Sequence, residues 1–321
     1  MMSPVSTPDA GTAAGAAQRI ALSVVVPSVN TLADVERALT ALDRESADVV
    51  LEIILVDRLG EPVRAAVRRT YPHVRILEAP TATTIPAMRM MGFDAARGEF
   101  VAVIEDHVIV PRGWARALID AHRKAQAGDP AKEAVVGGSV ENAATRNLVD
   151  WAAFLCEYSH CINPMPSGPS EWVTGNNVIY PRALLARYRD RLSEDQWENH
   201  LHGMMRADGV ELLMRPDIVV GHEKYYTVGE YLSQRYLYAR SYAGARVAEA
   251  TLMKRIAFGA AAAALPPVLF WRTVSRILAK QRHRGELLRS LPLLAVFVTA
   301  WAAGEVVGSW FGAGDSLQKV R

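Results

Sequence analysis

The residues best suited to chemistry stand together near the end of the first third of the chain. Glu105, Asp106 and His107 follow directly after the apolar run 101–104. Such a run is typical of a strand buried on both faces, so the three polar side chains are expected at its carboxyl end. Two carboxylates and one imidazole crowded at one place favour a bound cation. Oxygen ligands with one imidazole suit Mn²⁺ or Mg²⁺, which commonly complete their coordination shell with substrate phosphates.

The positions of these three residues along a strand suggest different roles for them. Side chains alternate between the two faces of a strand, so Glu105 and His107 are expected on one side and Asp106 on the other. Glu105 and His107 are therefore the predicted metal pair. Asp106 has an alternative interpretation, in which it faces solvent or caps a turn.

Segments of strand and helix character alternate on both sides of this cluster and must position it. The strand-like runs are rich in Val and Ile, and the stretches between them have helical spacing of apolar residues. The strands are expected at 22–27, 52–57, 74–78 and 100–105, and the helices at 31–45, 61–70, 84–97 and 113–126. This alternation indicates an α/β sheet, in which ligands bind at the carboxyl ends of the strands. Asp57 and Glu105 are then expected at the same edge.

The regular alternation fades after about residue 135. The run 172–180 is interpreted as a strand interrupted by a glycine turn, and 195–208 as a helix that Gly209 ends. A further strand is expected at 210–214. Residues 228–249 are predicted to form a helix rich in Tyr and Arg.

The last part of the chain has two apolar runs separated by a basic segment. The first, 256–271, has no charged residue but contains Pro266 and Pro267, which would break a helix. The second, from Leu291 to about Phe311, is long enough to cross a bilayer only if Glu305 is tolerated. We expect the first run to lie in the interface at the cytoplasmic face of the membrane and the second run to be able to span the membrane. The alternative is a buried helical hairpin of a soluble protein.

Composition narrows the class of protein further. The chain has 321 residues, half of them apolar, and a formal net charge of +2. Without a lysine–arginine stripe in the first 250 residues, nucleic acid is not an expected partner. Its two cysteines, Cys156 and Cys161, favour a reducing compartment rather than a disulfide framework. Residues 1–20 are interpreted as a disordered tail and not a signal peptide, which places any catalytic portion in the cytoplasm.

The order of motifs resembles glycosyltransferase family 2 over roughly residues 22–250. The matching stretches are Ser23–Asn30, Leu55–Asp57, Ala87–Gly92, Ala95–Phe100, Glu105–His107, Pro111–Trp114, Gly175–Asn177, Trp197–Glu198 with Gly209, and Val219–His222. Four motifs depart from the family pattern. Glu-x-His replaces the Asp-x-Asp metal motif, Arg58 replaces a second acid of the nucleotide loop, Met90 replaces an Asn, and Trp197 replaces the first acid of a Glu-Asp pair.

This resemblance implies a fold and a division of the chain. Residues 21–250 are expected to form a GT-A type domain, with a mixed, mostly parallel sheet flanked by helices. Residues 251–321 are expected to form membrane-associated helices, because the tail 301–308 resembles that of membrane-associated bacterial members.

The resemblance also assigns roles to individual residues. The metal ligands would be Glu105, His107 and His222, although His222 could instead contact phosphate. The catalytic base would be Glu198, with Asp195 as the nearby alternative. Substrate-binding residues would be Pro27, Asn30, Asp57, Arg89, Asp106, Gly175, Asn176, Arg235 and Arg240. The two last arginines could meet a lipid phosphate or the donor diphosphate, or lie at the membrane interface with their tyrosine neighbours.

The implied activity is inverting transfer of a sugar from a nucleotide-diphosphate donor to a lipid-linked or cell-envelope acceptor. It would take place at the cytoplasmic membrane face and depend on Mn²⁺ or Mg²⁺. The expected partners are the nucleotide sugar, a lipid or glycan acceptor and membrane lipids. The alternative is an inactive membrane scaffold or regulator of the same fold. A nicotinamide-dependent oxidoreductase is disfavoured, because no Gly-x-Gly-x-x-Gly follows the first strand.

Overall fold

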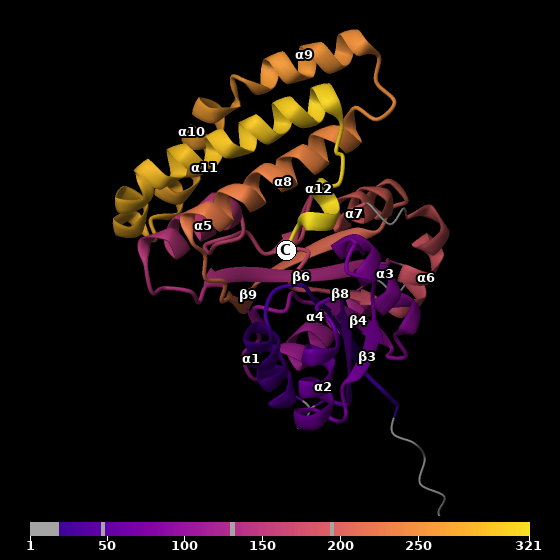
Figure 1. Ribbon diagram of the computed structural model, residues 1–321. Coiled ribbons are helices and arrows are strands. Elements are labelled where there is room, and N and C mark those ends of the chain that lie inside the picture. The colour runs from indigo at the N-terminus through magenta and orange to yellow at the C-terminus, as the bar shows by residue number, and fades with distance from the viewer. Residues whose placement is uncertain (1–18, 46–48, 129–131, 193–195) are drawn as a thin grey trace, which may run out of the picture.

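The computed structural model describes residues 19–45, 49–128, 132–192 and 196–321 (Figure 1). Nearly all of the tail predicted over 1–20 lies outside these residues, and so does Asp195.

One sheet runs through the described part of the chain. Its strands are β1 (Leu22–Ser28), β2 (Leu51–Asp57), β3 (Arg75–Glu78), β4 (Phe100–Val103), β5 (Val108–Ile109), β6 (Ala134–Asn142), β7 (Gly168–Pro169), β8 (Val178–Pro181) and β9 (Glu211–His222). They lie in the order β3-β2-β1-β4-β8-β6-β9-β5, and β7 also pairs with β9. The first four strands along this order are parallel, whereas β8 is antiparallel to both of its neighbours.

The sheet separates two apolar cores. Along β1, the side chains of Val24 and Val26 enter one core and that of Val25 enters the other, because successive side chains of a strand point to opposite faces. Both faces are covered by helices, so every residue of β1 is buried. This explains the continuous apolar run in place of an apolar–polar alternation.

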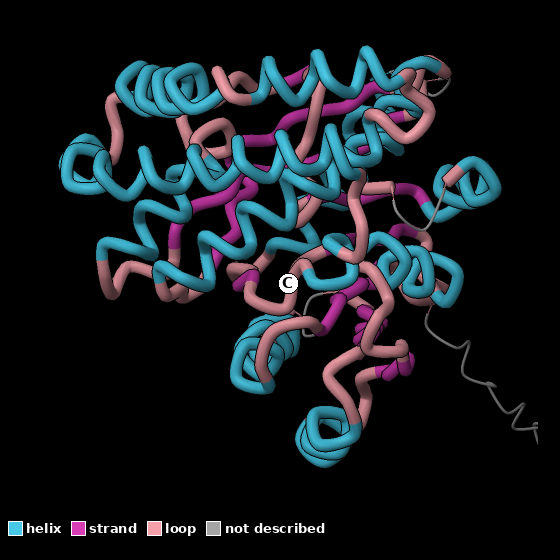
Figure 2. The backbone as a smooth tube through the Cα atoms, turned by 45° about the horizontal axis from the view of Figure 1, so that its top comes forward, coloured by secondary structure: helices cyan, strands magenta, loops and turns pink. Residues whose placement is uncertain are grey.

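Helices fill both faces of the sheet and form a second layer above it. They are α1 (Leu32–Asp43), α2 (Glu61–Thr70), α3 (Ile85–Ala95), α4 (Trp114–Gly128), α5 (Leu148–Tyr158), α6 (Arg182–Tyr188), α7 (Glu198–Ala207), α8 (Val228–Arg246), α9 (Leu252–Ala262), α10 (Leu265–Lys280), α11 (Arg284–Phe311) and α12 (Ser316–Lys319). The long helices α8 and α11 run side by side (Figure 1). Figure 2 shows long helices layered over one side of the sheet. Helices α9 and α10 lie outside them (Figure 1).

Helices α8 and α11 approach closely through glycines. A Cβ atom placed on Gly304 would lie 2.3 Å from the carbonyl oxygen of Tyr236, and one on Gly308 would lie 2.4 Å from that of Arg240. Between these glycines, the buried carboxylate of Glu305 accepts hydrogen bonds of 3.0 and 3.1 Å from the Arg246 guanidinium. The charge of Glu305 is therefore accommodated by pairing with a neighbouring helix.

Several element boundaries differ from those expected. Strand β4 ends at Val103, so Glu105 and His107 lie in the loop that follows and not on a strand. The segment 172–177 is irregular, and only its continuation forms β8. Strand β9 continues to His222, past the expected end at Met214. It extends because β6 pairs with it along the whole edge, through a shift in register at Gly138 and Ser139.

The apolar C-terminal runs form helices as expected, and the two prolines interrupt the first run between α9 and α10. Helix α10 begins with Pro266 and Pro267 in its first turn, and the pair α9 and α10 is bent by 54°. Among the described residues, α11 is the one unbroken helix long and apolar enough to cross a bilayer, and 39% of its most apolar window is buried. Length and composition therefore allow one span, but one face of α11 is buried against the rest of the protein.

Candidate functional site

The three predicted metal ligands converge at one edge of the sheet. The pairing of Val108 in β5 with His222 in β9 brings the loop after β4 beside the end of β9. The Nε2 atoms of His107 and His222 lie 3.0 Å apart, and Oε2 of Glu105 lies 3.4 Å and 4.0 Å from them. Atoms about 2.1 Å from one ion lie roughly 3–4 Å from each other. The three side chains therefore fit a single divalent cation.

Asp106 lies behind this group and holds it in place. It is fully buried, and its Oδ2 accepts hydrogen bonds from the backbone N–H groups of Val29 and Asn30, at 2.7 and 2.9 Å. Its Oδ1 accepts from Asn30 Nδ2 at 2.6 Å and lies 2.9 Å from Nδ1 of His107. The alternative in which Asp106 faces solvent is therefore wrong. Its partners make it a residue that positions His107 and the end of β1, whereas the sequence had suggested contact with substrate.

The two histidines are prepared to offer their Nε2 atoms. A carboxylate at Nδ1, as Asp106 provides for His107, fixes the ring and leaves Nε2 toward the metal position. Burial, then the neighbouring His107 and Lys224, hold the pKa of His222 well below its usual value. His222 is therefore neutral near pH 7, which is the form that binds a metal ion.

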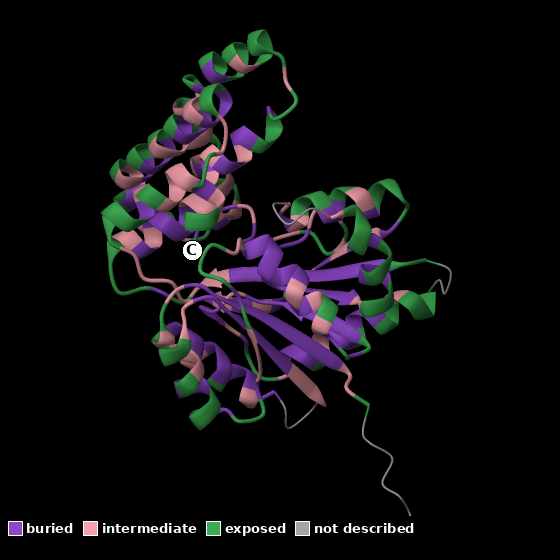
Figure 3. Cartoon of the chain, turned by 45° about the vertical axis from the view of Figure 1, so that its right-hand side comes forward, coloured by how far each residue is buried: buried purple, intermediate pink, exposed green. Residues whose placement is uncertain are grey.

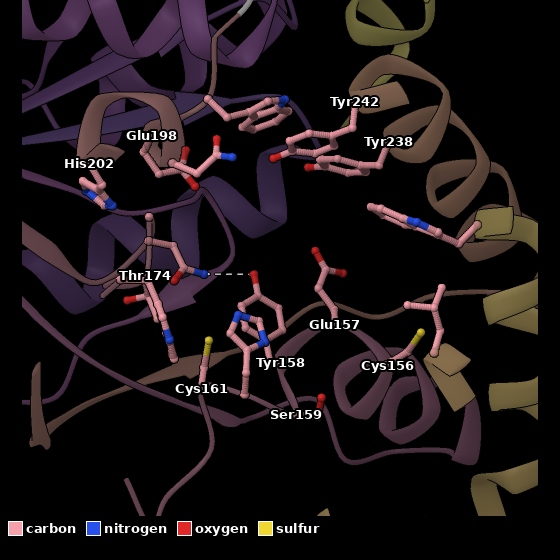
Figure 4. A pocket seen from close by; sticks show the side chains of 18 of the residues that line it. Cys156, Glu157, Tyr158, Ser159, Cys161, Thr174, Glu198, His202, Tyr238 and Tyr242 are labelled. Carbon is pink, nitrogen blue, oxygen red and sulfur yellow. Dashed lines mark hydrogen bonds between the residues drawn. The ribbon is translucent and has the colours of Figure 1, made fainter. Parts of the chain in front are cut away.

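Two neighbours fix the carboxylate of Glu105. Oε2 accepts hydrogen bonds from Nδ2 of Asn176 at 3.0 Å and from the hydroxyl of Tyr158 at 3.3 Å. Asn176 also donates to the Tyr158 oxygen at 3.0 Å, the bond drawn in Figure 4. The predicted substrate-binding Asn176 thus lies at the metal candidate and orients one of its ligands.

A second acid lies on the other side of Arg89. Glu198 is the first residue of α7 and accepts a hydrogen bond at Oε2 from the buried guanidinium of Arg89. Nη2 of Arg89 also lies 3.7 Å from Oε1 of Glu105. Burial opposes the charge of Arg89, but the adjacent Glu198 and Glu105 raise its pKa above the usual value. Arg89 therefore links the candidate base to the candidate metal site.

Gly175 leaves the space in which the Glu198 carboxylate lies. A Cβ atom on Gly175 would be 2.0 Å from Oε1 of Glu198, a distance that no side chain tolerates. We therefore expect Gly175→Ala to displace this carboxylate and to lower the turnover of donor by about 100-fold, the cost of misplacing a reacting group by roughly 1 Å. Initial rates of donor consumption measure the effect. Gly203→Ala is the matched control, because a Cβ there meets nothing within 4 Å, and equal rates for both variants would contradict the assignment.

Asp57 stands at the carboxyl end of β2, as expected, but it is fully enclosed. Oδ1 accepts hydrogen bonds from the Ser28 hydroxyl at 2.9 Å and the Leu59 N–H at 3.2 Å. Oδ2 accepts from the Gly60 N–H at 3.1 Å and the Arg64 guanidinium at 3.2 Å. In this conformation Asp57 organises the loop after β2 and exposes no surface.

Pro27 lies near the end of β1 and Asn30 just after it, and both are close to the metal candidate. Pro27 lines a small cavity together with Glu105 and His107. The side-chain amide of Asn30 donates to Asp106, and its oxygen accepts from the ammonium group of Lys224. Both residues therefore border the site that the sequence assigned to them.

The structure separates the two arginines of α8. Arg235 lies in the wall of a large cavity. Its Nη1 atom is 3.8 Å from Oε2 of Glu157, and its guanidinium carbon is 4.3 Å from the centroid of the Trp301 ring. Arg240 instead donates to the carbonyl oxygen of Gly312, 3.2 Å away, in the link after α11. Five residues of helix turn the side chain by about 140°, so the two point to different faces. The prediction that Arg240 shares a substrate site with Arg235 is therefore not supported by their placement.

The large cavity has a volume of about 880 Å³ and lies between the sheet domain and helices α8, α10 and α11. Glu105, Arg89 and Glu198 border it on the sheet side, and Figure 4 shows Glu157, Tyr238 and Tyr242 facing into it. Its aromatic lining comprises Trp172, Trp197, Tyr158, Tyr238, Tyr242 and Trp301. Aromatic faces of this kind suit the apolar faces of sugar rings as well as lipid chains.

Sequence reasoning did not identify Tyr158, Glu157 or Trp197 as site residues. Glu157 and Tyr158 are the last two residues of α5, in a part of the sequence where strand-like and helix-like runs no longer alternate regularly. The sequence marks them only as two polar residues at the end of an apolar stretch. The ring centroid of Trp197 lies 5.3 Å from that of Tyr238 and 6.1 Å from that of Tyr242, both in α8. The Tyr-rich composition of α8 was the available sign that this helix faces a cavity.

Comparison with known protein families finds a match over the part of the chain that carries the first motifs, up to and including Glu105–His107 and Trp114. The glycosyl transferase family 2 model matches residues 23–154. The solved structure titled "Crystal structure of S. aureus TarS 1-349" is similar at 13% identity, with 89% of this chain and 90% of that chain covered and a TM-score of 0.49. A search of curated proteins finds no match. The mixed sheet with helices on both faces is consistent with the GT-A fold, and the match to the glycosyl transferase family 2 model is confined to residues 23–154.

Proposed function

We propose that this protein transfers a sugar, with inversion, from a nucleoside diphosphate to a hydroxyl group of an acceptor. The observation that carries this proposal is the convergence of Glu105, His107 and His222 beside the Arg89–Glu198 pair. The match of residues 23–154 to the glycosyl transferase family 2 model supports glycosyl transfer as the reaction class. The donor base and the sugar are left open by these residues.

On the donor side, Glu105, His107 and His222 would hold a divalent cation. Mn²⁺ or Mg²⁺ bound there would stabilise the negative charge that develops on the departing diphosphate. Asp106 and Asn176 keep the ligand side chains in one arrangement through the hydrogen bonds described above. Arg89 adds a fixed positive charge on the side of the reacting sugar.

On the acceptor side, Glu198 is the proposed general base. Oε2 of Glu198 accepts a hydrogen bond from Arg89, whereas Oε1 of Glu198 lies over the backbone of Gly175 at the cavity wall. Oε1 is therefore the atom that can accept the proton of an acceptor hydroxyl as the new glycosidic bond forms. Asp195, the alternative base, lies outside the described residues.

The acceptor would enter the large cavity between the sheet domain and the C-terminal helices. Leu265, Leu269, Arg272 and Arg276 of α10 form its wall on the helical side. Among the described residues, no acidic group pairs with Arg272 or Arg276, unlike Arg235 and Arg246. An acceptor that is both amphipathic and anionic suits this wall, such as a lipid-linked or cell-envelope glycan.

We further propose the division of the chain into residues 21–250, which carry the chemistry, and residues 251–321, which attach it to a membrane. Large apolar side chains on α9 and α10 are exposed, with Met253 at 75% and Trp271 at 71% (Figure 3). Basic neighbours such as Lys254 suit anionic headgroups. Because α11 is packed against α5 and α8, attachment at the cytoplasmic surface through α9 and α10 fits better than a crossing by α11.

Membrane attachment can be tested with a charge-matched pair of variants. We expect Met253→Glu combined with Trp271→Glu to reduce binding to vesicles of anionic phospholipid by about tenfold or more, because two apolar anchors become charged. Lys124→Glu, on the exposed face of α4, changes the net charge by the same amount and is expected to bind nearly as the wild type does. Co-sedimentation measures both. An equal loss of vesicle binding in Lys124→Glu would mean that the change in net charge causes the effect and would contradict attachment through α9 and α10.

The reaction itself is tested by donor consumption. Purified protein with Mn²⁺ is expected to release nucleoside diphosphate from one member of a panel of nucleotide sugars when bacterial membrane lipids are supplied as acceptors. Glu171→Gln, an exposed acid at the cavity mouth, is expected to keep the rate, and Glu198→Gln to lose it. No release from any donor by folded, Mn²⁺-loaded protein would favour the inactive scaffold instead.

A further inference from the structure

Residues 316–321, here called the closing segment, lie against the donor side of the candidate site. They comprise α12 and the two residues after it, and the end of the described chain lies close to the sheet, below α8 (Figure 1). Val320 is fully buried in the core that also contains Val29 and Ile85. The backbone N–H of Arg321 donates to Gln234 of α8 at 2.8 Å.

Arg58 clamps this segment to the end of β2. Its guanidinium donates to the carbonyl oxygens of Val320 and, at 3.3 Å, of Gln318, and also to that of Thr83 at 2.7 Å. Arg58 is the residue that stands in place of the second acid in the family's nucleotide loop. Its departure from the family pattern thus coincides with a contact to the chain's own backbone.

The closing segment leaves almost no space on the side of the metal candidate where His107 and His222 lie. Arg321 lines a cavity with Pro27, Glu105, His107 and His222, and only about 20 Å³ remains in it. That volume holds about one water molecule, whereas sites for ligands of nucleotide size typically enclose several hundred Å³. Asp57, the proposed contact of the base, is likewise enclosed in this conformation.

The segment also carries positive charge into an acidic pocket. Arg321 lies near Arg58, and burial together with this second cation lowers the pKa of Arg58. Arg321 lines a pocket together with Glu105 and Asp106, where a divalent cation would otherwise offset the negative charge of the carboxylates.

The link to α11 contains a suitable hinge. Gly312 and Gly314 have φ values of 82° and 55°, in the left-handed region that glycine adopts readily. Both precede the closing segment and follow the end of α11, so rotation there would move the segment without disturbing the packing of α8 on α11.

We propose that residues 316–321 form a displaceable plug of the donor pocket, so that nucleotide sugar binds only after the segment has left. This inference rests on the proposed function for the location of the donor site. The consequence is competition: the segment lowers the apparent affinity for nucleotide by the fraction of molecules in which the pocket is open.

Val320→Asp in the full-length protein tests the plug. Burying a carboxylate in an apolar core is unfavourable, so the segment is expected to be released and the apparent Kd for nucleotide in the presence of Mn²⁺ to fall by about tenfold or more. Lys319→Ala is the matched control, because the Lys319 side chain is 60% exposed and pairs with Asp315, which directly precedes the closing segment. Its affinity is expected to match that of the wild type.

Hydrogen exchange of the wild-type protein gives a second, mutation-free readout. Saturating nucleotide with Mn²⁺ is expected to accelerate exchange in residues 316–321 while it slows exchange around Glu105 and His107. Equal nucleotide affinity in wild type and Val320→Asp, with unchanged exchange in 316–321, would overturn the plug and leave the proposed function standing. Failure of both proteins to bind any nucleotide while folded and loaded with Mn²⁺ would overturn the donor site and the plug together.

Discussion

Replacing His107 with alanine is expected to abolish metal-dependent nucleotide binding. Nε2 of His107 is the atom nearest to both other candidate ligands, at 3.0 Å from His222 and 3.4 Å from Glu105. Loss of a residue that merely orients a ligand typically costs 10–100-fold in metal affinity, so loss of a ligand itself is expected to cost at least about 100-fold. Titration of the protein with Mn²⁺, followed by calorimetry, measures this directly.

Two comparisons separate this effect from a general loss of structure. His73→Ala removes an exposed histidine that pairs with Asp43 on the far side of the sheet domain, and Mn²⁺ affinity is expected to be unchanged. His222→Ala is expected to lose about as much affinity as His107→Ala, since one ion would use both side chains. If His107→Ala bound Mn²⁺ as tightly as the wild type, with its thermal unfolding unaltered, the metal site would have to lie elsewhere.

Glu198→Gln is expected to lower the turnover of donor by about 10²–10⁴-fold, the range that general base catalysis contributes. Glutamine keeps the size of the side chain and an oxygen that can accept from Arg89, so α7 and the cavity wall are expected to remain in place. It cannot take up the proton of an acceptor hydroxyl. The Kd for donor nucleotide, measured separately, is therefore expected to change little, and kcat to carry nearly the whole loss.

The opposite pattern would change the role of Glu198. A large rise in Kd for donor nucleotide with unchanged kcat would mean that Glu198 holds Arg89 in place and that another group accepts the proton. Arg89→Lys helps to distinguish the two, because a lysine keeps the charge but not the planar pair of donors. We expect this variant to lower turnover less than Glu198→Gln does.

Much of the architecture followed from local patterns in the sequence. The continuous Val- and Ile-rich runs predicted strands covered on both faces, and β1 and β2 lie within a residue of their expected bounds. The apolar stripe of 32–42 predicted α1, whose Val35, Leu39 and Leu42 are fully buried. Such patterns are local, and burial follows from them directly.

The grouping of the site residues needed more than local pattern. Glu105 and His222 are 117 positions apart, and the order of family motifs was what placed them together. The alternative in which Asp106 faces solvent was wrong, because the chain turns inward after β4 ends at Val103 and Asp106 meets the N–H groups of Val29 and Asn30. A turn of this kind depends on long-range hydrogen bonds that the sequence pattern does not encode.

The closing segment was equally out of reach of the sequence. Ser316–Lys319 is a single helical turn with little apolar character, and nothing in its composition points to the end of β2. Its position depends on Arg58, a residue 262 positions from Val320, and on a buried site for one valine side chain. Contacts of this range appear only in the folded protein.

The most direct test of the central claim is calorimetric binding of UDP and GDP, with and without Mn²⁺. It is measured on the wild type, on Val320→Asp, in which the closing segment is expected to be released, and on Val320→Asp combined with His107→Ala. We predict that one of the two nucleotides binds, that binding requires Mn²⁺, that it is tightest in Val320→Asp, and that it is lost when His107 is also replaced. Absence of binding of either nucleotide to folded Val320→Asp protein at saturating Mn²⁺ would contradict the assignment of Glu105, His107 and His222 to a nucleotide-sugar site.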